Sequence, residues 1–181
     1  MEDTLNECLI LVDNSNIFIE GGKFAAKKKG IPAASPEQVP IDFSWRIDFG
    51  ALLREVANGH TIVKAILVGS TPPPNDSLWG IAQSRGFEVI KYERAQSGEK
   101  AVDTQIVASG LKVIYKHDKP AILKLLSGDR DFVPLINCAY EEGWETELWG
   151  FRGSISTELA MTVNRVKELD PVFDKIGKYA V

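Results

Sequence analysis

The sequence predicts an α/β fold, a three-layer α/β/α sandwich built on a mostly parallel sheet of about five to six strands. Short, continuous apolar runs such as Cys8–Val12 and Ala121–Leu126 are typical of strands buried on both faces of a parallel sheet. These runs alternate with segments whose apolar residues recur at helical spacing. Strands that alternate with helices favour right-handed crossovers, which place helices on both faces of the sheet.

The composition favours one domain over residues 1–181 and a soluble protein. The chain is 44% hydrophobic and 25% charged, as ordinary globular proteins are. Its net charge of −4 argues against a general nucleic-acid coat but does not exclude an enzyme that acts on nucleic acid. The acidic start is wrong for a signal peptide, and no apolar stretch is long enough to span a membrane. We therefore expect a cytoplasmic protein, with Cys8 and Cys138 as small reduced residues.

The first half of the chain is divided by polar turns and prolines. Asp13-Asn14-Ser15-Asn16 ends the first strand in turn formers that can also start a helix. Three prolines indicate that Gly30 to Pro40 is a loop, which could shape a substrate groove or a homodimer contact. The other expected elements are a helix over 41–58, strands over 61–68 and 87–92, a helix over 75–84, and loops over 69–74 and 93–100.

The second half continues the alternation of strands and helices. Apolar residues at helical spacing predict a helix over 101–116, followed by the strand Ala121–Leu126. Ser154 or Ser156 is expected to cap a short helix that runs to Met161. The other expected elements are a helix that Gly143 ends, a strand over 144–149 and an edge strand over 163–169.

The helix expected after Asn16 carries the densest cationic cluster in the chain. Its members are Lys23, Lys27, Lys28 and Lys29. Such a run is usually a solvated helix face. The alternative is a flank that attracts phosphate beside a carboxylate site, with Lys23 and Lys27 as substrate contacts.

Phe151 and Arg152 follow the strand expected over 144–149. An aromatic ring and a guanidinium at a strand end could stack on or clamp a nucleotide. The sequence supports equally well a core position for Phe151 and a surface position for Arg152.

Asp129 and Asp131 lie in a turn between a predicted strand and a predicted helix. Two such carboxylates repel each other, and burying either is costly unless a cation compensates. A divalent metal is the usual compensation. The alternative is that both are N-cap and first-turn acids, stabilised by free amides and the helix dipole. A helical line through Asp131, Leu135 and Cys138 also predicts that Asp131 points inward.

Asp103 falls near the middle of the apolar arc of the helix expected over 101–116. A carboxylate on the core side of a helix needs a partner, so we expect a third site acid here. Pairing with amides at the helix N-terminus is the alternative. Gly110, two turns later near the same line, would let another element approach the helix closely.

The carboxyl ends of parallel strands share one edge of the sheet, where ligands bind. Asp13, Asp129 and Asp131 can therefore converge there with Asp103. Four carboxylates without histidine or cysteine suit Mg²⁺ or Mn²⁺ rather than zinc. Because P-loop and dinucleotide-binding motifs are absent, metal-assisted phosphoryl chemistry remains, in which the metal activates water to attack a phosphodiester.

Three segments share a further pattern: Val12-Asp13-Asn14-Ser15-Asn16, Lys100-Ala101-Val102-Asp103 and Ser127-Gly128-Asp129-Arg130-Asp131-Phe132-Val133-Pro134-Leu135. In order and spacing they resemble the signatures of the NYN domain, a family of the PIN-like nuclease superfamily that includes the LabA-like proteins. The resemblance covers roughly residues 8–170, which would be the core of the domain. The chain departs from the family pattern at Thr104, where valine is frequent, and at Asn164, where an acid is frequent.

The resemblance implies a Rossmann-like fold and metal-dependent cleavage of RNA. Asn16 would position a carboxylate or a water molecule, and Lys100 would contact a phosphate. The acids that would hold the metal are Asp13, Asp103, Asp129 and Asp131.

The sequence thus predicts a metal-dependent ribonuclease with a four-aspartate site. One alternative is a non-catalytic NYN module that binds RNA or protein and keeps the metal site. Another is a Toprim-like phosphotransfer enzyme, although such a domain would be expected to use a glutamate where this chain has Asp13.

Overall fold

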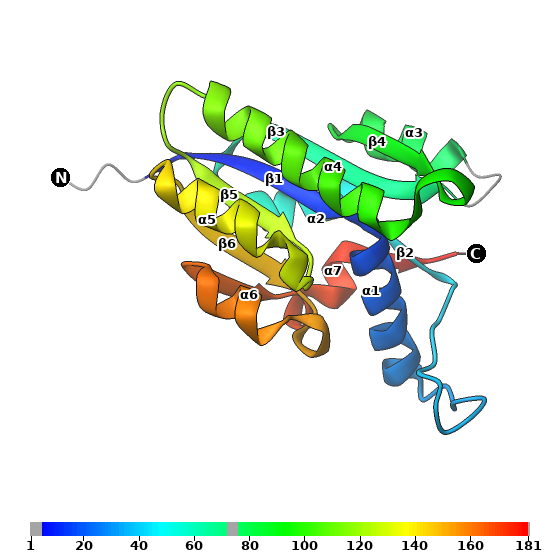
Figure 1. The fold of residues 1–181 in the computed structure, drawn as a ribbon. Coiled ribbons are helices and arrows are strands. Elements are labelled where there is room, and N and C mark those ends of the chain that lie inside the picture. The colour runs from blue at the N-terminus through cyan, green and yellow to red at the C-terminus, as the bar shows by residue number, and fades with distance from the viewer. Residues whose placement is uncertain (1–4, 72–75, 181) are drawn as a thin grey trace.

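Six parallel strands form the main sheet (Figure 1), in the order β4-β3-β1-β5-β6-β7. The structure is a computed structural model that describes residues 5–71 and 76–180. For residues 71, 76 and 93–101 it describes the backbone alone. The strands are β1 (Glu7–Asp13), β3 (Thr61–Thr71), β4 (Glu88–Glu93), β5 (Ile122–Leu126), β6 (Glu145–Gly150) and β7 (Arg165–Glu168).

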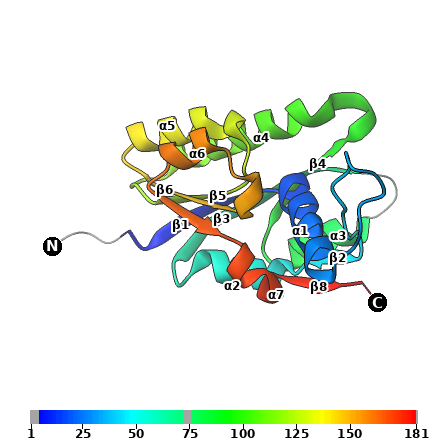
Figure 2. The same ribbon diagram turned by 90° about the horizontal axis from the view of Figure 1, so that it is seen from below.

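Helices cover both faces of this sheet (Figure 2), which confirms the predicted three-layer α/β/α sandwich. One face carries α4 (Arg94–Lys116), α5 (Val133–Glu141) and α6 (Thr157–Thr162). The other carries α1 (Asn14–Lys29), α2 (Phe49–Ala57), α3 (Asp76–Ser84) and α7 (Phe173–Ile176). On that second side, β2 (Trp45–Ile47) pairs antiparallel with β8 (Gly177–Tyr179). Within residues 5–71 and 76–180, no helix has the length and apolar character that crossing a membrane requires.

Strand β1 divides the two apolar cores. Leu9 and Leu11 belong to the core beneath α4 and α5, whereas Cys8, Ile10 and Val12 belong to the core beneath α1 and α2. Successive side chains of a strand point to opposite faces, so a strand covered on both faces must be apolar at every position. The unbroken apolar run in the sequence therefore reflects the central position of β1.

The strand order reverses beside β1. The chain adds β3 and β4 on one side of β1, and then returns to add β5, β6 and β7 on the other. In an open α/β sheet such a topological switch point opens a crevice at the carboxyl ends of the strands, where ligands bind. Asp13 ends β1 and Ser127 follows β5, so both residues border this crevice.

The helix predicted over 41–58 is correct only in its second part. Trp45–Ile47 forms β2 instead, and α2 begins at Phe49, capped by Asp48, whose side chain accepts a hydrogen bond from Ala51 N. Trp45 and Ile47 are both buried and pair with β8, at the far end of the chain. This long-range pairing overrides the helical pattern of the local sequence.

Two predicted loops also differ from the structure. The segment over 93–100 is helical from Arg94 onward, because α4 begins with polar helix formers that give no apolar periodicity. The loop predicted over 69–74 is strand as far as Thr71, and the rest of it lies outside the described residues.

Lys124 is completely buried in the middle of β5. Its Nζ donates hydrogen bonds to the carbonyls of Val56 (2.7 Å) and Ala57 (3.1 Å), and so caps the C-terminus of α2. The same ammonium lies 3.4 Å from the carboxylate of buried Glu147, which also accepts a hydrogen bond from Trp149 Nε1 (2.6 Å). The charge of Lys124 is therefore satisfied entirely within the protein.

We expect Lys124→Ala to lower the free energy of unfolding by about 3–5 kcal/mol, because it leaves two buried carbonyls without their donor and buried Glu147 with Arg165 as its one remaining ion-pair partner among the described residues. Urea denaturation measures this loss. Lys112→Ala, at an exposed position of α4, is the control and should change the free energy by less than about 0.5 kcal/mol. A loss below about 1 kcal/mol for Lys124→Ala would show that the buried cation is dispensable.

A second charged contact anchors the segment that follows α1. Lys29 Nζ lies 2.6 Å from Asp42 Oδ2, and Asp42 Oδ1 accepts hydrogen bonds from the amide and the hydroxyl of Ser44. These partners lower the pKa of Asp42 from 3.8 to about 2. Asp42 N also donates to the carbonyl of Gly22 (2.9 Å), so the segment returns to the side of α1.

The charged form of Asp42 stabilises the fold above about pH 4, and this contribution disappears as the pH falls toward about 2. We therefore expect the free energy of unfolding of Asp42→Asn to fall less steeply than that of the wild type across this range. Urea denaturation at a series of acidic pH values measures both slopes. Asp174→Asn, which breaks the exposed pair with Lys28, is the control and should keep the wild-type slope. Equal slopes for all three proteins would contradict the prediction.

Candidate functional site

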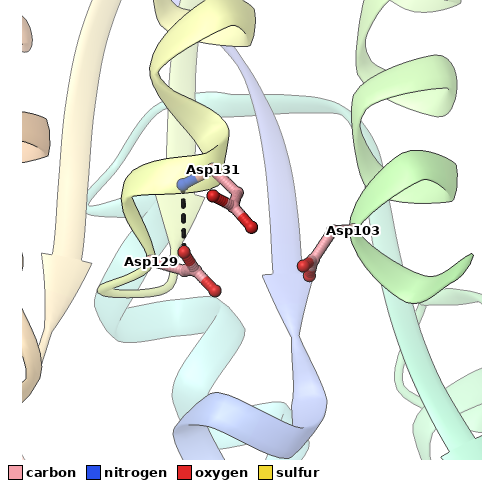
Figure 3. A group of neighbouring side chains, drawn as sticks. All are labelled: Asp103, Asp129 and Asp131. Atoms are coloured by element: carbon pink, nitrogen blue, oxygen red, sulfur yellow. Dashed lines mark hydrogen bonds between the residues drawn. The ribbon is translucent and has the colours of Figure 1, made fainter. Parts of the chain in front are cut away.

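Three aspartates meet at the carboxyl edge of the sheet (Figure 3). Asp129 and Asp131, from the turn after β5, point toward Asp103 on α4. One carboxylate oxygen of each residue lies within 4.8 Å of the corresponding oxygens of the other two. Asp103 and Asp129 are half-buried and Asp131 is exposed, so the cluster opens to solvent. The structure thus brings together residues that are separated by up to 28 positions in the sequence.

Asp13 borders the same space from β1. A pocket of about 160 Å³ is lined by Asp13, Ser15, Asn16, Ile19, Glu20, Ser70, Val102, Asp103 and Asp129. Asp13 is also the N-cap of α1, since its Oδ1 accepts a hydrogen bond from Asn16 N (3.3 Å). All four predicted acids therefore lie at one end of the sheet. Asp103, Asp129 and Asp131 form the close cluster, and Asp13 lines the adjoining pocket.

Hydrogen bonds tie the turn after β5 to the end of β1. Ser127 Oγ donates to Asp13 Oδ2 (3.1 Å), and Gly128 N donates to Asn16 Oδ1 (3.3 Å). Within the turn, Asp131 N donates to Asp129 Oδ1 (2.9 Å). Donors directed at carboxylate oxygens offset their negative charge, so the bonds to Asp13 and Asp129 relieve part of the repulsion between the closely spaced acids.

Two glycines let the surrounding elements approach closely enough to form the site. A Cβ at Gly128 would lie 2.0 Å from the carbonyl oxygen of Ser154, while Ser156 N donates to the Gly128 carbonyl (2.9 Å). A Cβ at Gly110 would lie 2.8 Å from Leu11 Cδ1, which confirms the close approach predicted there. Gly110 thus seats α4 against β1, two turns after Asp103.

Asp131 is exposed, and the prediction that it points inward is wrong. The 3₁₀ helix η1 (Arg130–Phe132) separates Asp129 from α5, and its tighter turn shifts Asp131 off the line through Leu135. Phe132 is buried in its place. Asp131 consequently contributes its carboxylate from the solvent side of the cluster.

Sequence reasoning missed several polar residues of the site, among them Ser127 and Glu20. Ser127 is buried and donates to Asp13, and Glu20 lines the pocket from α1. A signal for Glu20 was present, because its spacing of four residues from Asn16 places both on one side of a helix. For Ser127 the sequence gives only its place beside the predicted turn.

The predicted cationic contacts divide into two groups. Lys23, Lys27 and Arg152 line a groove beside the acid pocket, and Glu20 borders both spaces. Lys28 and Lys29 instead pair with Asp174 and Asp42, away from the pocket. Lys100 lies in α4, but its side chain is outside the part of the structure that is described.

Phe151 belongs to the core, so its interpretation as a stacking platform is wrong. It is 3% exposed and packs against Phe24 and Phe173. The neighbouring Arg152 is at the surface, where its Nε donates to Glu168 (3.0 Å).

Asn164, where the family frequently has an acid, has a structural role. Its Oδ1 accepts hydrogen bonds from Thr146 N (2.8 Å) and Thr146 Oγ1 (3.0 Å), which join β6 to the start of β7. This position therefore supports the sheet rather than the acid cluster.

The donor set suits a divalent cation. Hard cations take carboxylate oxygens at about 2.0–2.6 Å, so two ligands of one ion lie no more than about 5 Å apart. The oxygens of Asp103, Asp129 and Asp131 meet this condition at 4.8 Å or less. The cluster contains neither histidine nor cysteine, so all of its potential ligands are the oxygen donors that hard cations prefer.

The parallel sheet and the acids at its switch point make this an α/β protein with a candidate metal site. The chain belongs to the NYN domain family, whose sequence model matches residues 8–170, and this confirms the resemblance seen in the three signature segments. Among solved structures, a protein of unknown function from Vibrio parahaemolyticus is similar, with a TM-score of 0.70. The match covers 98% of this chain and 99% of that chain at 17% identity, and so shows the fold alone. No curated protein matches the chain.

We expect Gly128→Ala to destabilise the fold by about 1–3 kcal/mol, because the new methyl group would overlap the backbone of the segment that follows β6. Urea denaturation measures this loss. Gly153→Ala is the matched control, since nothing lies within 4 Å of a Cβ at that position. If both variants were equally stable, close packing at Gly128 would not be what holds the acidic turn in place.

Proposed function

We propose that the protein is a divalent-metal-dependent ribonuclease. The observation that carries the proposal is the meeting of Asp103, Asp129 and Asp131 within 4.8 Å at the switch point of the sheet. Membership of the NYN domain family, within the PIN-like nucleases, supports RNA as the partner and phosphodiester hydrolysis as the reaction. The proposed location is the cytoplasm, which agrees with the free thiols of Cys8 and Cys138.

The proposal assigns a task to each part of the site. The metal ligands are Asp13, Asp103, Asp129 and Asp131. A bound Mg²⁺ or Mn²⁺ would neutralise charge on the phosphodiester and promote ionisation of the attacking water. Asn16 is a positioning residue, because its side chain holds the backbone of Gly128.

In this proposal the groove residues Lys23, Lys27 and Arg152 attract the phosphates of the RNA electrostatically. Lys23 already has an acidic neighbour, Glu20, at 2.8 Å, whereas Lys27 is exposed and has no ion pair within the described residues. We therefore expect Lys27 to contribute most to phosphate binding.

A non-catalytic NYN module that keeps the metal site is the second candidate. The same acid cluster supports it, because carboxylates can hold a metal without supporting hydrolysis. A Toprim-like enzyme loses its support, since the chain matches the NYN family over 8–170. Cleavage and binding must therefore be measured on the same protein.

We expect purified protein to cleave labelled mixed-sequence RNA with Mg²⁺ or Mn²⁺, to leave matching DNA uncut, and to be inactive in EDTA. Asp129→Asn with Asp131→Asn should lower the rate at least about 100-fold, because the loss of two metal ligands removes several kcal/mol of charge stabilisation. Gel analysis of the labelled products measures the rate.

Asp118→Asn, in an exposed loop after α4, is the matched control and should cleave like the wild type. The double variant, in contrast, reveals contaminating ribonuclease, whose cleavage would persist in every preparation. Wild-type cleavage by the folded double variant would refute the assigned site. RNA binding without cleavage by folded wild-type protein, whichever metal is added, would favour the non-catalytic module.

A further inference from the structure

A second concave surface continues from the acid pocket along α1. This groove has a volume of about 680 Å³, in the range of pockets that bind small molecules. Its lining residues are Glu20, Lys23, Phe24, Lys27, Gly30, Ile31, Val39, Pro40, Phe151, Arg152, Gly153 and Asp170. Because Glu20 also lines the acid pocket, the two spaces share a wall.

Helix α1 connects the two spaces with one polar stripe. Asn16, Glu20, Lys23 and Lys27 follow one another at spacings of three and four residues, which places them along one side of the helix. From Asn16 to Lys27 the helix rises about 16 Å. A ligand that enters at the acids can therefore extend along α1 into the groove while it remains beside polar groups.

Part of the groove lining is apolar. Ile31 and Val39, from the loop between α1 and β2, are 38% and 64% exposed. The ring of Phe24 is half-buried and fixed by Phe173, with ring centroids 4.8 Å apart. Apolar side chains left open to water in a groove favour a ligand with a flat, weakly hydrated face.

The charges of the groove distinguish between ligands. Its cations are Lys23, Lys27 and Arg152, of which Lys23 pairs with Glu20 and Arg152 with Glu168. Its other acid, Asp170, accepts a hydrogen bond from Arg152 N. Lys27 is exposed and has no ion pair in the part of the chain that the structure describes. An apolar wall with a cationic rim matches a nucleotide, which carries a base with an open face and a phosphate.

We propose that this groove is the subsite for an unpaired nucleotide of the RNA, with its base on Phe24, Ile31 and Val39 and its phosphate near Lys27. The inference rests on the proposed ribonuclease function and adds the position and state of the nucleotide beside the acids. A base inside a duplex is covered on both faces by its stacked neighbours and cannot lie against this wall. RNA with an unpaired nucleotide next to the cut is therefore the substrate class that the groove selects. This assigns the loop from Gly30 to Pro40 to the substrate groove, of the two roles that the sequence left open.

The test measures RNA binding in EDTA, where the site cannot cleave. Fluorescence anisotropy compares a short labelled RNA as a single strand and annealed to its complement. Ile31→Ser with Val39→Ser should weaken single-strand binding at least about tenfold and leave duplex binding unchanged, because only the stacked base is lost. Ile62→Ser is the matched control. The exposed fraction of Ile62, 37%, is close to the 38% of Ile31, but Ile62 lies on β3 at the opposite end of the sheet. It should bind both RNAs like the wild type.

A second pair of variants tests the phosphate contact. Lys27→Gln should lower the slope of log affinity against log salt for the single strand by about 0.7, the value for one phosphate contact. Lys116→Gln, at an exposed position in the last turn of α4, should leave the slope unchanged. Equal slopes would exclude Lys27 from the subsite.

The outcomes separate the subsite from the ribonuclease proposal. Unchanged single-strand binding by the folded Ile31/Val39 variant, with normal cleavage by the wild type, would overturn the subsite alone. If the wild type neither binds nor cleaves RNA, the proposed function fails and the subsite fails with it. A wild type that is dimeric by light scattering, with a monomeric Ile31/Val39 variant, would instead identify the loop as a contact between two copies and overturn the subsite.

Discussion

Mutual repulsion among the carboxylates is the constraint on which the candidate site depends. Asp103, Asp129 and Asp131 lie within 4.8 Å of one another, and Asp13 borders the adjoining pocket. Amide and hydroxyl donors from the neighbouring turn and helix relieve part of this repulsion, including the hydroxyl of Ser127. Since Ser127 and Gly128, after β5, donate to Asp13 and Asn16, at the end of β1, the pairing of these two strands also positions the site. The remaining negative charge favours a cation.

Strand β5 contains a buried charged residue, and the turn that follows it contains accessible ones. In its middle, the ammonium of Lys124 is sealed from water and satisfied by Val56, Ala57 and Glu147. At its end, the acids of the following turn remain partly accessible. A charge whose partners all lie inside the protein is closed to ligands, whereas an accessible cluster can bind one. The same strand thus secures α2 at one point and presents the site at another.

The sequence was informative where structure depends on near neighbours and weak where it depends on distant ones. Strand ends such as Asp13 could be predicted because buried parallel strands leave unbroken apolar runs that stop at polar turns. The prediction of one helix over 41–58 was wrong in its first part, because β2 pairs with a strand far along the chain. The predicted orientation of Asp131 was wrong, because a 3₁₀ turn replaces the assumed α-helical period. The sequence offered the loop over 30–40 as one side of a substrate groove, but it could not show that Lys23, Lys27 and Arg152 line the same groove, since separate segments form it.

The backbone of the loop from Gly30 to Pro40 makes few hydrogen bonds to the rest of the protein. Its backbone hydrogen bonds join it to itself and to the end of α1, as in the bonds Gln38 N to Ser35 O and Ile31 N to Ala26 O. The acids, in contrast, are fixed by the sheet and by α4. Insertions and substitutions in the loop can therefore accumulate without moving a single carboxylate. Descendants of such a protein could change which molecules they accept while they inherit the same reactive centre.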